Sequence, residues 1–479
     1  MERNSWLDKA FDPESIAIVG VSRNERLINT GYTGIRFLRM LKSSGFKGKI
    51  YAVNPKANEV EGIKVYPSLS SIPEPLDLII VTVPAASVPP VLEDCTSSGA
   101  LNVHVCTSGF NETGEAEGKE LEDRLLQIAQ RDGLRIIGPN CMGYHVPSVG
   151  LSMYDDVPLL HGPVALITQS GGCGQFFIMQ CAARGIGVSK VISYGNGLTT
   201  DATDYLEYLA TDQDTRIICM YLEGVSDGSR LTRLVRRINR DKPVIIWKGG
   251  VTDSGARAVA THTGSLAGDN KVWDAFFRQT GAIRVASVEE MADVTMTLLY
   301  LHSSSGRRAA VFGGGGGGIN VVRGDVCVEE GLEVPMFSSE TRIQLMEFIS
   351  LVNQGVLNPM DIPGVLFDHA LLERTINVVA ADPLTDIMIL HLPVGLLAHL
   401  LEKRSQVFHD FLQCISRLSQ QTYERKPLVV SLIDPGNSGE TKKFVTILRE
   451  ASITVYDSLR DACRALNRCA RYHEFMEEA

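Results

Sequence analysis

One histidine lies in a stretch of small residues that gives it little to pack against. Residues 258–268 read Ala-Val-Ala-Thr-His-Thr-Gly-Ser-Leu-Ala-Gly, with His262 in the middle. Such a stretch favours a mobile loop, and loops on rigid scaffolds often carry function. Because a neutral imidazole can attack phosphorus through a ring nitrogen, the segment predicts a histidine that carries a phosphoryl group.

An acidic residue is expected to support this histidine. Glu223 follows a predicted strand, Arg216–Leu222, and stands before a glycine. A carboxylate bound to the second ring nitrogen fixes the tautomer of an imidazole and raises its basicity. Glu223 is therefore the expected partner of His262, and a surface or helix-capping role is the competing interpretation.

A glycine-rich turn offers a place for the phosphate. Gln169-Ser170-Gly171-Gly172 lies between the predicted strand Val164–Thr168 and the predicted apolar helix Phe176–Ala183. Glycines let the backbone approach an anion, and a helix N-terminus favours negative charge. Ser170, Gly171 and Gly172 form the predicted phosphate site, with a plain tight turn as the alternative. A similar run, Gly313–Gly318, also fits close packing between domains.

A second ligand site is predicted near the start of the chain. Gly20 and Ser22 follow the predicted strand Ile16–Val19, where backbone N–H groups can face a phosphate. The dinucleotide fingerprint GxGxxG is missing there, and Lys56 follows the second strand, where NAD sites usually carry an acid. A lysine suits the extra phosphate of coenzyme A, which is favoured over NAD. NADP, or a turn with a surface lysine, is the alternative.

Further strand ends add to this predicted site. Val83-Pro84 and Gly138–Cys141 each follow a predicted strand, and open α/β sheets bind ligands at such carboxyl ends. Cys141 has His145 near it in sequence, but the punctuation by Pro139 and Gly143 leaves no helix to align the two. We therefore expect a thiol that packs or lines a pocket rather than a nucleophile.

The composition sets limits on the class of protein. The 479 residues, 44% of them hydrophobic, suffice for about three domains with buried cores. A net charge of −10 argues against nucleic acid or an anionic membrane surface as a partner. The polar start predicts no signal peptide, and no apolar run is long enough to span a bilayer. Ten cysteines without a CxxC pair indicate reduced thiols in a cytoplasmic protein.

Short apolar strands alternate with helical patterns along the chain, which predicts α/β domains with parallel sheets. The second and third of three such units share one plan, and each has a lysine–proline pair before its third matching strand. The corresponding strands are Val164–Thr168 and Ala309–Phe312, Arg216–Leu222 and Asp386–Leu392, Val244–Trp247 and Leu428–Leu432, and Ile283–Val285 and Ile453–Val455. After the third of these strands the second unit carries Val251–Gly268, where the third has only Asn437–Glu440. The histidine segment is thus an addition to a common scaffold.

Four motifs together resemble the α subunit of the NDP-forming acyl-CoA synthetases, relatives of succinyl-CoA synthetase. They are residues 261–268, 169–172, 138–141 and 358–361. The resemblance covers nearly the whole chain and implies a Rossmann-like CoA-binding domain over residues 1–150, followed by two flavodoxin-like parallel-sheet domains. The first of these, residues 151–304, would bear the phosphohistidine, and the second, residues 305–479, would serve for docking.

The resemblance also implies a reaction. ATP, a carboxylic acid and CoA would give ADP, phosphate and acyl-CoA through an acyl phosphate, with His262 as the phosphoryl carrier. Glu223 would support that histidine, and Ser170, Gly171 and Gly172 would hold its phosphate. The implied CoA site consists of Gly20, Ser22, Lys56, Val83, Pro84 and Asn140.

No ATP-grasp domain is recognisable, so the resemblance implies that ATP, with Mg²⁺, binds a separate β subunit in an α2β2 heteromer. A swinging His262 segment would carry phosphate between the subunits. The segment Arg23–Gly31 departs from the family pattern, and no CoA contact is assigned to it. The competing functions are an ATP-independent acyl or carbamoyl transferase and a non-catalytic CoA-binding regulatory subunit.

Overall fold

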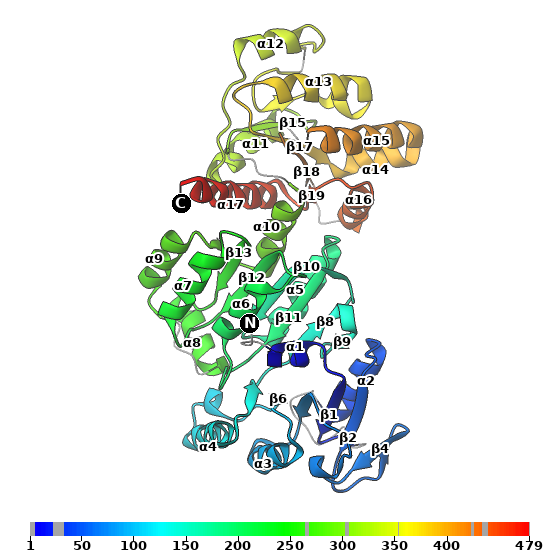
Figure 1. The fold of residues 1–479 in the computed structure, drawn as a ribbon. Helices are drawn as coiled ribbons and strands as arrows, with labels where there is room; N and C mark the ends of the chain where they lie inside the picture. The colour runs from blue at the N-terminus through cyan, green and yellow to red at the C-terminus, as the bar shows by residue number, and fades with distance from the viewer. Residues whose placement is uncertain are drawn as a thin grey trace. The chain divides into compact units, whose positions relative to one another are not determined.

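Three β-sheets organise the chain (Figure 1). The computed structural model describes residues 5–22, 33–263, 268–301, 306–352, 354–422, 426–433 and 439–478. The chain divides into two compact units, Met1–Met291 with the first two sheets and Ala292–Ala479 with the third. Within the described ranges, no helix is both long enough and apolar enough to cross a membrane.

The first sheet has the strand order β3-β4-β2-β1-β5-β6-β7. β1 and β5 are wholly buried runs rich in branched residues, as expected for parallel strands covered on both faces. The order reverses between β1 and β5, as it does in Rossmann-type sheets. The strands are β1 (Ser15–Val19), β2 (Lys49–Val53), β3 (Glu59–Val60), β4 (Ile63–Tyr66), β5 (Leu78–Val81), β6 (Asn102–Val105) and β7 (Arg135–Ile137). The helices are α1 (Ser5–Phe11), α2 (Gly34–Ser43), η2 (Leu69–Ser71), η3 (Ala85–Ser87), α3 (Val88–Ser98), η4 (Asn111–Thr113) and α4 (Ala116–Asp132).

The second sheet has the order β14-β13-β12-β10-β11-β8-β9. Its five later strands are parallel in the flavodoxin-like order, which reverses between β10 and β12. β8 joins antiparallel to β11. The strands are β8 (Gly143–Val146), β9 (Leu151–Ser152), β10 (His161–Thr168), β11 (Val188–Ser193), β12 (Ile217–Leu222), β13 (Val244–Lys248) and β14 (Ile283–Val285). The helices are η5 (Pro147–Val149), α5 (Gly171–Ala183), α6 (Ala202–Thr211), α7 (Gly228–Ile238), α8 (Asp253–Thr263), α9 (Asn270–Thr280) and α10 (Val288–Tyr300).

The third sheet has the order β16-β15-β17-β18-β19, and all its pairs are parallel. Numbered along the chain, this is the same order as that of β10 to β14. The strands are β15 (Ala309–Gly313), β16 (Met360–Asp361), β17 (Ile387–Pro393), β18 (Leu428–Ile433) and β19 (Val455–Tyr456). The helices are α11 (Gly317–Glu329), α12 (Ser339–Met346), η6 (Pro363–Leu366), α13 (His369–Ala381), α14 (Val394–Lys403), α15 (Ser405–Thr422), α16 (Gly439–Glu450) and α17 (Leu459–Glu478). The fold class expected from the sequence, a Rossmann-like sheet followed by two flavodoxin-like sheets, is confirmed.

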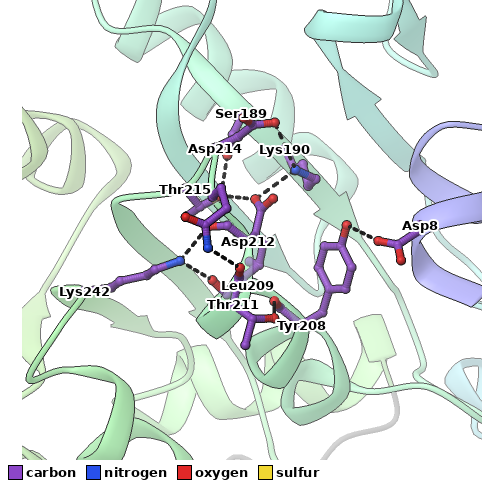
Figure 2. Close-up of polar contacts among 11 residues, drawn as sticks. Asp8, Ser189, Lys190, Tyr208, Leu209, Thr211, Asp212, Asp214, Thr215 and Lys242 are labelled. Atoms are coloured by element: carbon purple, nitrogen blue, oxygen red, sulfur yellow. Dashed lines mark hydrogen bonds and ion pairs between the residues drawn. The ribbon is translucent and has the colours of Figure 1, made fainter. Parts of the chain in front are cut away.

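The lysine–proline pairs explain part of the internal match between the second and third sheets. Lys242 Nζ donates hydrogen bonds to the carbonyl oxygens of Leu209, at 2.8 Å, and Asp212, at 2.6 Å, where α6 ends (Figure 2). Lys426 Nζ donates in the same way to the carbonyl oxygen of Asp382, where α13 ends. In both sheets a lysine thus closes the helix that precedes the middle parallel strand.

The N-terminal helix is attached to the second sheet, although the first sheet follows it in the chain. Tyr208 on α6 donates a hydrogen bond to Asp8 on α1 at 3.0 Å (Figure 2). The buried ion pair between Lys190 and Asp212, at 2.8 Å, lies beside this contact, and the Lys190 ammonium is 6.0 Å from the centroid of the Phe11 ring. These contacts join the first two sheets into one unit.

The predicted loop around His262 is helical in its first part, so that expectation was wrong as far as Thr263. α8 covers residues 253–263, and the N–H of Gly255 in its first turn donates to Thr252 Oγ1 at 3.1 Å. Alanines are abundant in this segment, and their high helix propensity outweighs the loop signal of its small residues. Residues 264–267 lie outside the described residues.

Candidate functional site

The carboxyl edge of the second sheet brings the predicted turn at residues 169–172 close to the predicted site residue Glu223. Gln169 follows β10 and Glu223 follows β12, the two strands between which the order reverses. Gln169 Oε1 accepts hydrogen bonds from the backbone N–H groups of Glu223, at 2.5 Å, and Gly224, at 3.1 Å. Open α/β sheets bind ligands at such a reversal. The predicted histidine partner and the predicted phosphate turn therefore flank one expected ligand site.

Glu223 is a carboxylate in a largely dry setting. Only 2% of the residue is exposed, so the surface role considered from the sequence was wrong. Tyr221 donates its hydroxyl to Glu223 Oε1 at 3.1 Å. Burial and the neighbouring carboxylate raise the pKa of Tyr221, which keeps the phenol a donor. Such an anchored carboxylate can orient an imidazole.

The phosphate turn is a capped helix N-terminus. Ser170 is the N-cap of α5, and its side chain accepts a hydrogen bond from the N–H of Cys173 at 3.4 Å. The two glycines of this turn, Gly171 and Gly172, differ in the space around them. A Cβ on Gly171 would lie 2.2 Å from Cγ of Met142, so packing requires this glycine. Gly172 is exposed, and its nearest atom would be Ser170 Oγ at 4.0 Å, which leaves room for an anion beside it.

His262 belongs to the last turn of α8, and its side chain lies outside the described residues. The helix begins at the edge that carries Glu223, since it follows β13, the neighbour of β12. Asn270 Nδ2 donates to the carbonyl oxygen of Val251 at 2.8 Å and so ties the two ends of the inserted segment. Cα atoms of α8 come within 8 Å of those of η4, at the carboxyl edge of the first sheet. One helix thus connects the edges of the two sheets.

The predicted coenzyme A residues gather at the carboxyl edge of the first sheet. Gly20 follows β1 and Val83 follows β5, on either side of the reversal. A Cβ on Gly20 would lie 3.1 Å from Cγ1 of Val83 and 2.8 Å from Oγ1 of Thr82. Gly34 on α2 packs directly on this turn, since its Cβ would lie 2.9 Å from the carbonyl carbon of Gly20. Gly34 thus supplies the close helix–strand approach that the third fingerprint glycine gives in dinucleotide sites. The backbone of the turn at Gly20 therefore leaves room for a ligand to approach closely.

Lys56, Pro84 and Ser22 frame the same edge. Lys56 is exposed, and its N–H donates to Asn54 Oδ1 at 2.8 Å. The amide of Asn54 in turn donates to the carbonyl oxygen of Val21 at 2.7 Å, which fixes the lysine beside the Gly20 turn. Pro84 is exposed at the start of η3 and Ser22 is half-buried.

Asn140 reaches this edge from β7 through a left-handed turn. Its φ is 58°, it follows a cis Gly138-Pro139 bond, and its N–H donates to the carbonyl oxygen of Thr107 at 2.9 Å. Asn196, from the second sheet, accepts a long hydrogen bond from Asn140 Nδ2 at 3.4 Å. The asparagine predicted for the CoA site is therefore held by residues that follow both sheets of the first unit.

Asn196 also joins two carboxylates that sequence reasoning missed. Its Nδ2 lies 2.8 Å from Oε2 of both Glu112 and Glu122. Glu112 Oε1 accepts the N–H groups of Gly109, at 2.5 Å, and Phe110, at 3.1 Å, and so shapes the turn after β6. The sequence feature that could have identified Asn196 is its position between two glycines directly after a strand.

Two further predictions can be compared with the structure. Burial raises the pKa of the Cys141 thiol well above its usual range, and the residue is 6% exposed, which supports a packing thiol and not a nucleophile. In the run Gly313–Gly318, the first glycines pack within their own unit, whereas Gly316, Gly317 and Gly318 have open space around them, so packing between domains stays a prediction. Arg323 is fully buried and donates to the carbonyl oxygens of Gly314 and, at 3.2 Å, His391. A Cβ on Gly313 would lie 2.2 Å from the latter oxygen.

Comparisons with known proteins match this arrangement. A CoA binding domain model matches residues 14–147, and a succinyl-CoA ligase like flavodoxin domain model matches residues 161–298. The α subunit of ADP-forming acetate–CoA ligase I from Pyrococcus furiosus is 33% identical over 475 residues, which cover 98% of each chain. ADP-forming acetate–CoA ligase I from Archaeoglobus fulgidus is 36% identical over 80% of this chain, but the match spans only 54% of that longer protein.

A solved structure agrees with these sequence matches. The dinucleotide forming acetyl-coenzyme A synthetase 1 of Candidatus Korarchaeum cryptofilum, solved with phosphate and ADP, superposes with a TM-score of 0.81 at 30% identity. The match covers 98% of this chain and 97% of that chain. Together with the two matched domains, this shows that the chain belongs to the family of ADP-forming acetate–CoA ligase α subunits.

Proposed function

We propose that the chain is the α subunit of an ADP-forming acyl-CoA synthetase, an acid–thiol ligase that uses His262 as a phosphoryl carrier. The observation that carries the proposal is the pairing of Gln169 and Glu223 across the strand reversal, with the capped N-terminus of α5 beside it. Acetate, which names the relatives, is the first acid to test.

The proposed reaction has three balanced steps. The terminal phosphoryl group of ATP passes to a ring nitrogen of His262, with ADP leaving. The acid carboxylate then attacks this phosphorus, so that the N–P bond breaks and an acyl phosphate forms. Finally the CoA thiol attacks the acyl carbonyl, and its proton leaves with the phosphate. Glu223 would hold the proton of the second ring nitrogen throughout.

Each predicted residue has a role in these steps. Ser170, Gly171 and Gly172 would hold the phosphate at the N-terminus of α5. CoA would lie at the carboxyl edge of the first sheet, where exposed Lys56 fits a phosphate and the Gly20 turn admits a close ligand. The remaining proposed contacts of CoA are Ser22, Val83, Pro84 and Asn140.

The proposed partner is an ATP-grasp β subunit that binds ATP with Mg²⁺. Support comes from relatives named as α subunits and from the Archaeoglobus ligase, of which this chain matches about half. An α2β2 assembly, the domain limits 1–150, 151–304 and 305–479, a docking role for the last domain and a cytoplasmic location complete the proposal.

The test runs the reaction backwards, which removes the need for the ATP-binding subunit. The purified chain receives acetyl-CoA and radioactive phosphate, beside His262→Asn. An acid-labile, base-stable adduct that the variant lacks is the expected result. No adduct with any acyl-CoA despite measurable CoA binding would favour the regulatory subunit, and acyl transfer that needs neither ATP nor phosphate would favour the transferase.

A further inference from the structure

A lysine is buried at the edge that carries Glu223. Lys248 ends β13 and is 3% exposed. Its ammonium donates to the carbonyl oxygen of Gly249 and lies 5.4 Å from the centroid of the Trp273 ring. Trp273 also packs near Gly268, where the inserted segment ends, since a Cβ on that glycine would lie 3.4 Å from Nε1 of the indole.

The position is costly for a charged group without a further role. Burying an ammonium at the end of a buried strand costs desolvation free energy, and an apolar side chain there would avoid that cost. Burial lowers the pKa of Lys248 to about 8, while the carboxylate of Glu223 opposes the shift and Arg284 adds to it. Arg284 is itself paired with Asp274 at 2.5 Å. Burial keeps the neighbours of Glu223, Tyr221 and Cys173, neutral.

Three adjacent strands deliver groups of opposite sign to one edge. In the order β13-β12-β10, Lys248 ends the first strand, Glu223 follows the second, and Ser170 at the start of α5 follows the third. If the proposed function holds, a phosphoryl dianion enters this edge close to the Glu223 carboxylate. Two like charges in one partly dry site repel each other unless a cation balances them.

We propose that Lys248 is a positioning residue for phosphohistidine formation: its ammonium balances the carboxylate of Glu223 and lets a phosphoryl group lie beside that carboxylate. Lys248 acts through Glu223 and does not touch the phosphate. While the ammonium is charged, it offsets the negative charge of the Glu223 carboxylate, which holds the ring N–H of the histidine. When the ammonium loses its proton, the negative charges at the edge are no longer balanced, and the phosphorylated state becomes less stable.

A second lysine, just before the same strand, provides a matched control. Lys242 precedes β13, and it also donates to carbonyl oxygens from a half-buried position, but at the opposite edge of the sheet. Lys242→Met should therefore disturb packing without changing the charge beside Glu223. Lys248→Arg keeps the charge and Lys248→Met removes it.

The experiment measures the phosphohistidine level in the full-length chain with acetyl-CoA and radioactive phosphate between pH 6.5 and 9.5. At pH 7 we expect Lys248→Met to lower the level at least tenfold, while Lys248→Arg and Lys242→Met stay within about threefold of the unaltered chain. The level in the unaltered chain should fall as the pH rises through about 8, and this fall should be missing in Lys248→Arg.

A double-substitution cycle tests whether Lys248 acts through Glu223. With Glu223→Gln already present, Lys248→Met should lower the remaining level less than twofold. A full tenfold effect in that background, or equal effects of Lys248→Met and Lys242→Met, would overturn the role of Lys248 and leave the proposed function standing. Absence of label in the unaltered chain would instead count against the proposed function, and the role would fall with it.

Discussion

Gln169 holds the backbone of Glu223 across the gap between two strands. Its side-chain oxygen accepts the N–H groups of Glu223 and Gly224, at 2.5 and 3.1 Å, and Gln169 is only 4% exposed. One amide therefore satisfies two buried donors and fixes the point at which β12 leaves the sheet. The direction of the Glu223 carboxylate depends on this contact.

Gln169→Met should destabilise the first unit, because methionine fills the volume but leaves two buried N–H groups without an acceptor. The expected cost is about 1–3 kcal/mol of unfolding free energy. All three tryptophans, Trp6, Trp247 and Trp273, belong to this unit, so intrinsic fluorescence in urea reports on it alone. Gln213→Met, at an exposed site, is the control and should stay within about 0.5 kcal/mol. Equal midpoints for the two variants would contradict the prediction.

Gly20→Ala should weaken CoA binding. Gly20 has a φ of 97°, and the new Cβ would lie 2.8 Å from Thr82 Oγ1, so the turn at the end of β1 must shift. Gly62→Ala is a matched control, because Gly62 has a φ of 76° but open space around it. Both substitutions lower the free energy of unfolding by about 1–2 kcal/mol, because alanine is strained in a left-handed backbone conformation. Only Gly20→Ala also changes the shape of the proposed site. Calorimetric titration with CoA should show at least tenfold weaker binding for Gly20→Ala alone, and equal affinities would count against the site.

The sequence predicted the architecture well because buried parallel strands are short apolar runs that contrast with the helices between them. The matching runs around Lys242 and Lys426 even identified which strands of the two later sheets correspond. The start of the inserted segment was harder to predict. Small residues are typical of both loops and helices. At α8 the alanine content favoured the helix over the loop.

Candidate site residues could be proposed from the sequence where a strand end or a glycine gave a local signal, as for Glu223 and Gly20. Lys248 and Asn196 gave weaker signals, because their importance comes from groups that only the fold brings near them. Asn196 meets Glu112 across 84 positions of sequence, and the pairing of β12 with β13 places Lys248 opposite Leu222, the residue before Glu223. Propensity and spacing carry no information about such partners.

Two buried histidines should make the first unit sensitive to acid. Burial lowers the pKa of His104 and of His145 to about 4, and each has a ring nitrogen without a hydrogen-bond partner among the described residues. The unfolded chain binds protons near pH 6.5 and the folded one does not, so stability falls as the pH drops from about 6.5 to 4. Each histidine contributes at most about 3 kcal/mol to this loss. His104→Gln should flatten the dependence of urea stability on pH, and an unchanged slope would contradict this.

Asn196→Asp should destabilise the contact between the first two sheets in a pH-dependent way. The change replaces the amide shared by Glu112 and Glu122 with a third carboxylate, and burial already raises the pKa of Glu122. At pH 7 the expected loss is more than about 2 kcal/mol, because donors are lost and like charges meet. Crowded carboxylates have raised pKa values in the folded state, so this loss should shrink as the pH falls from 7 to 5.

Asn196→Leu separates the two causes, because it removes the donors without adding charge. Its loss of stability should change less between pH 7 and 5 than that of Asn196→Asp, and identical pH profiles would refute the electrostatic explanation. Leucine also removes the oxygen that accepts from Asn140 Nδ2, whereas aspartate keeps it, so CoA affinity should fall in the leucine variant. Unchanged CoA affinity in the leucine variant would mean that the other contacts of Asn140, among them its N–H bond to Thr107, are enough to position that residue.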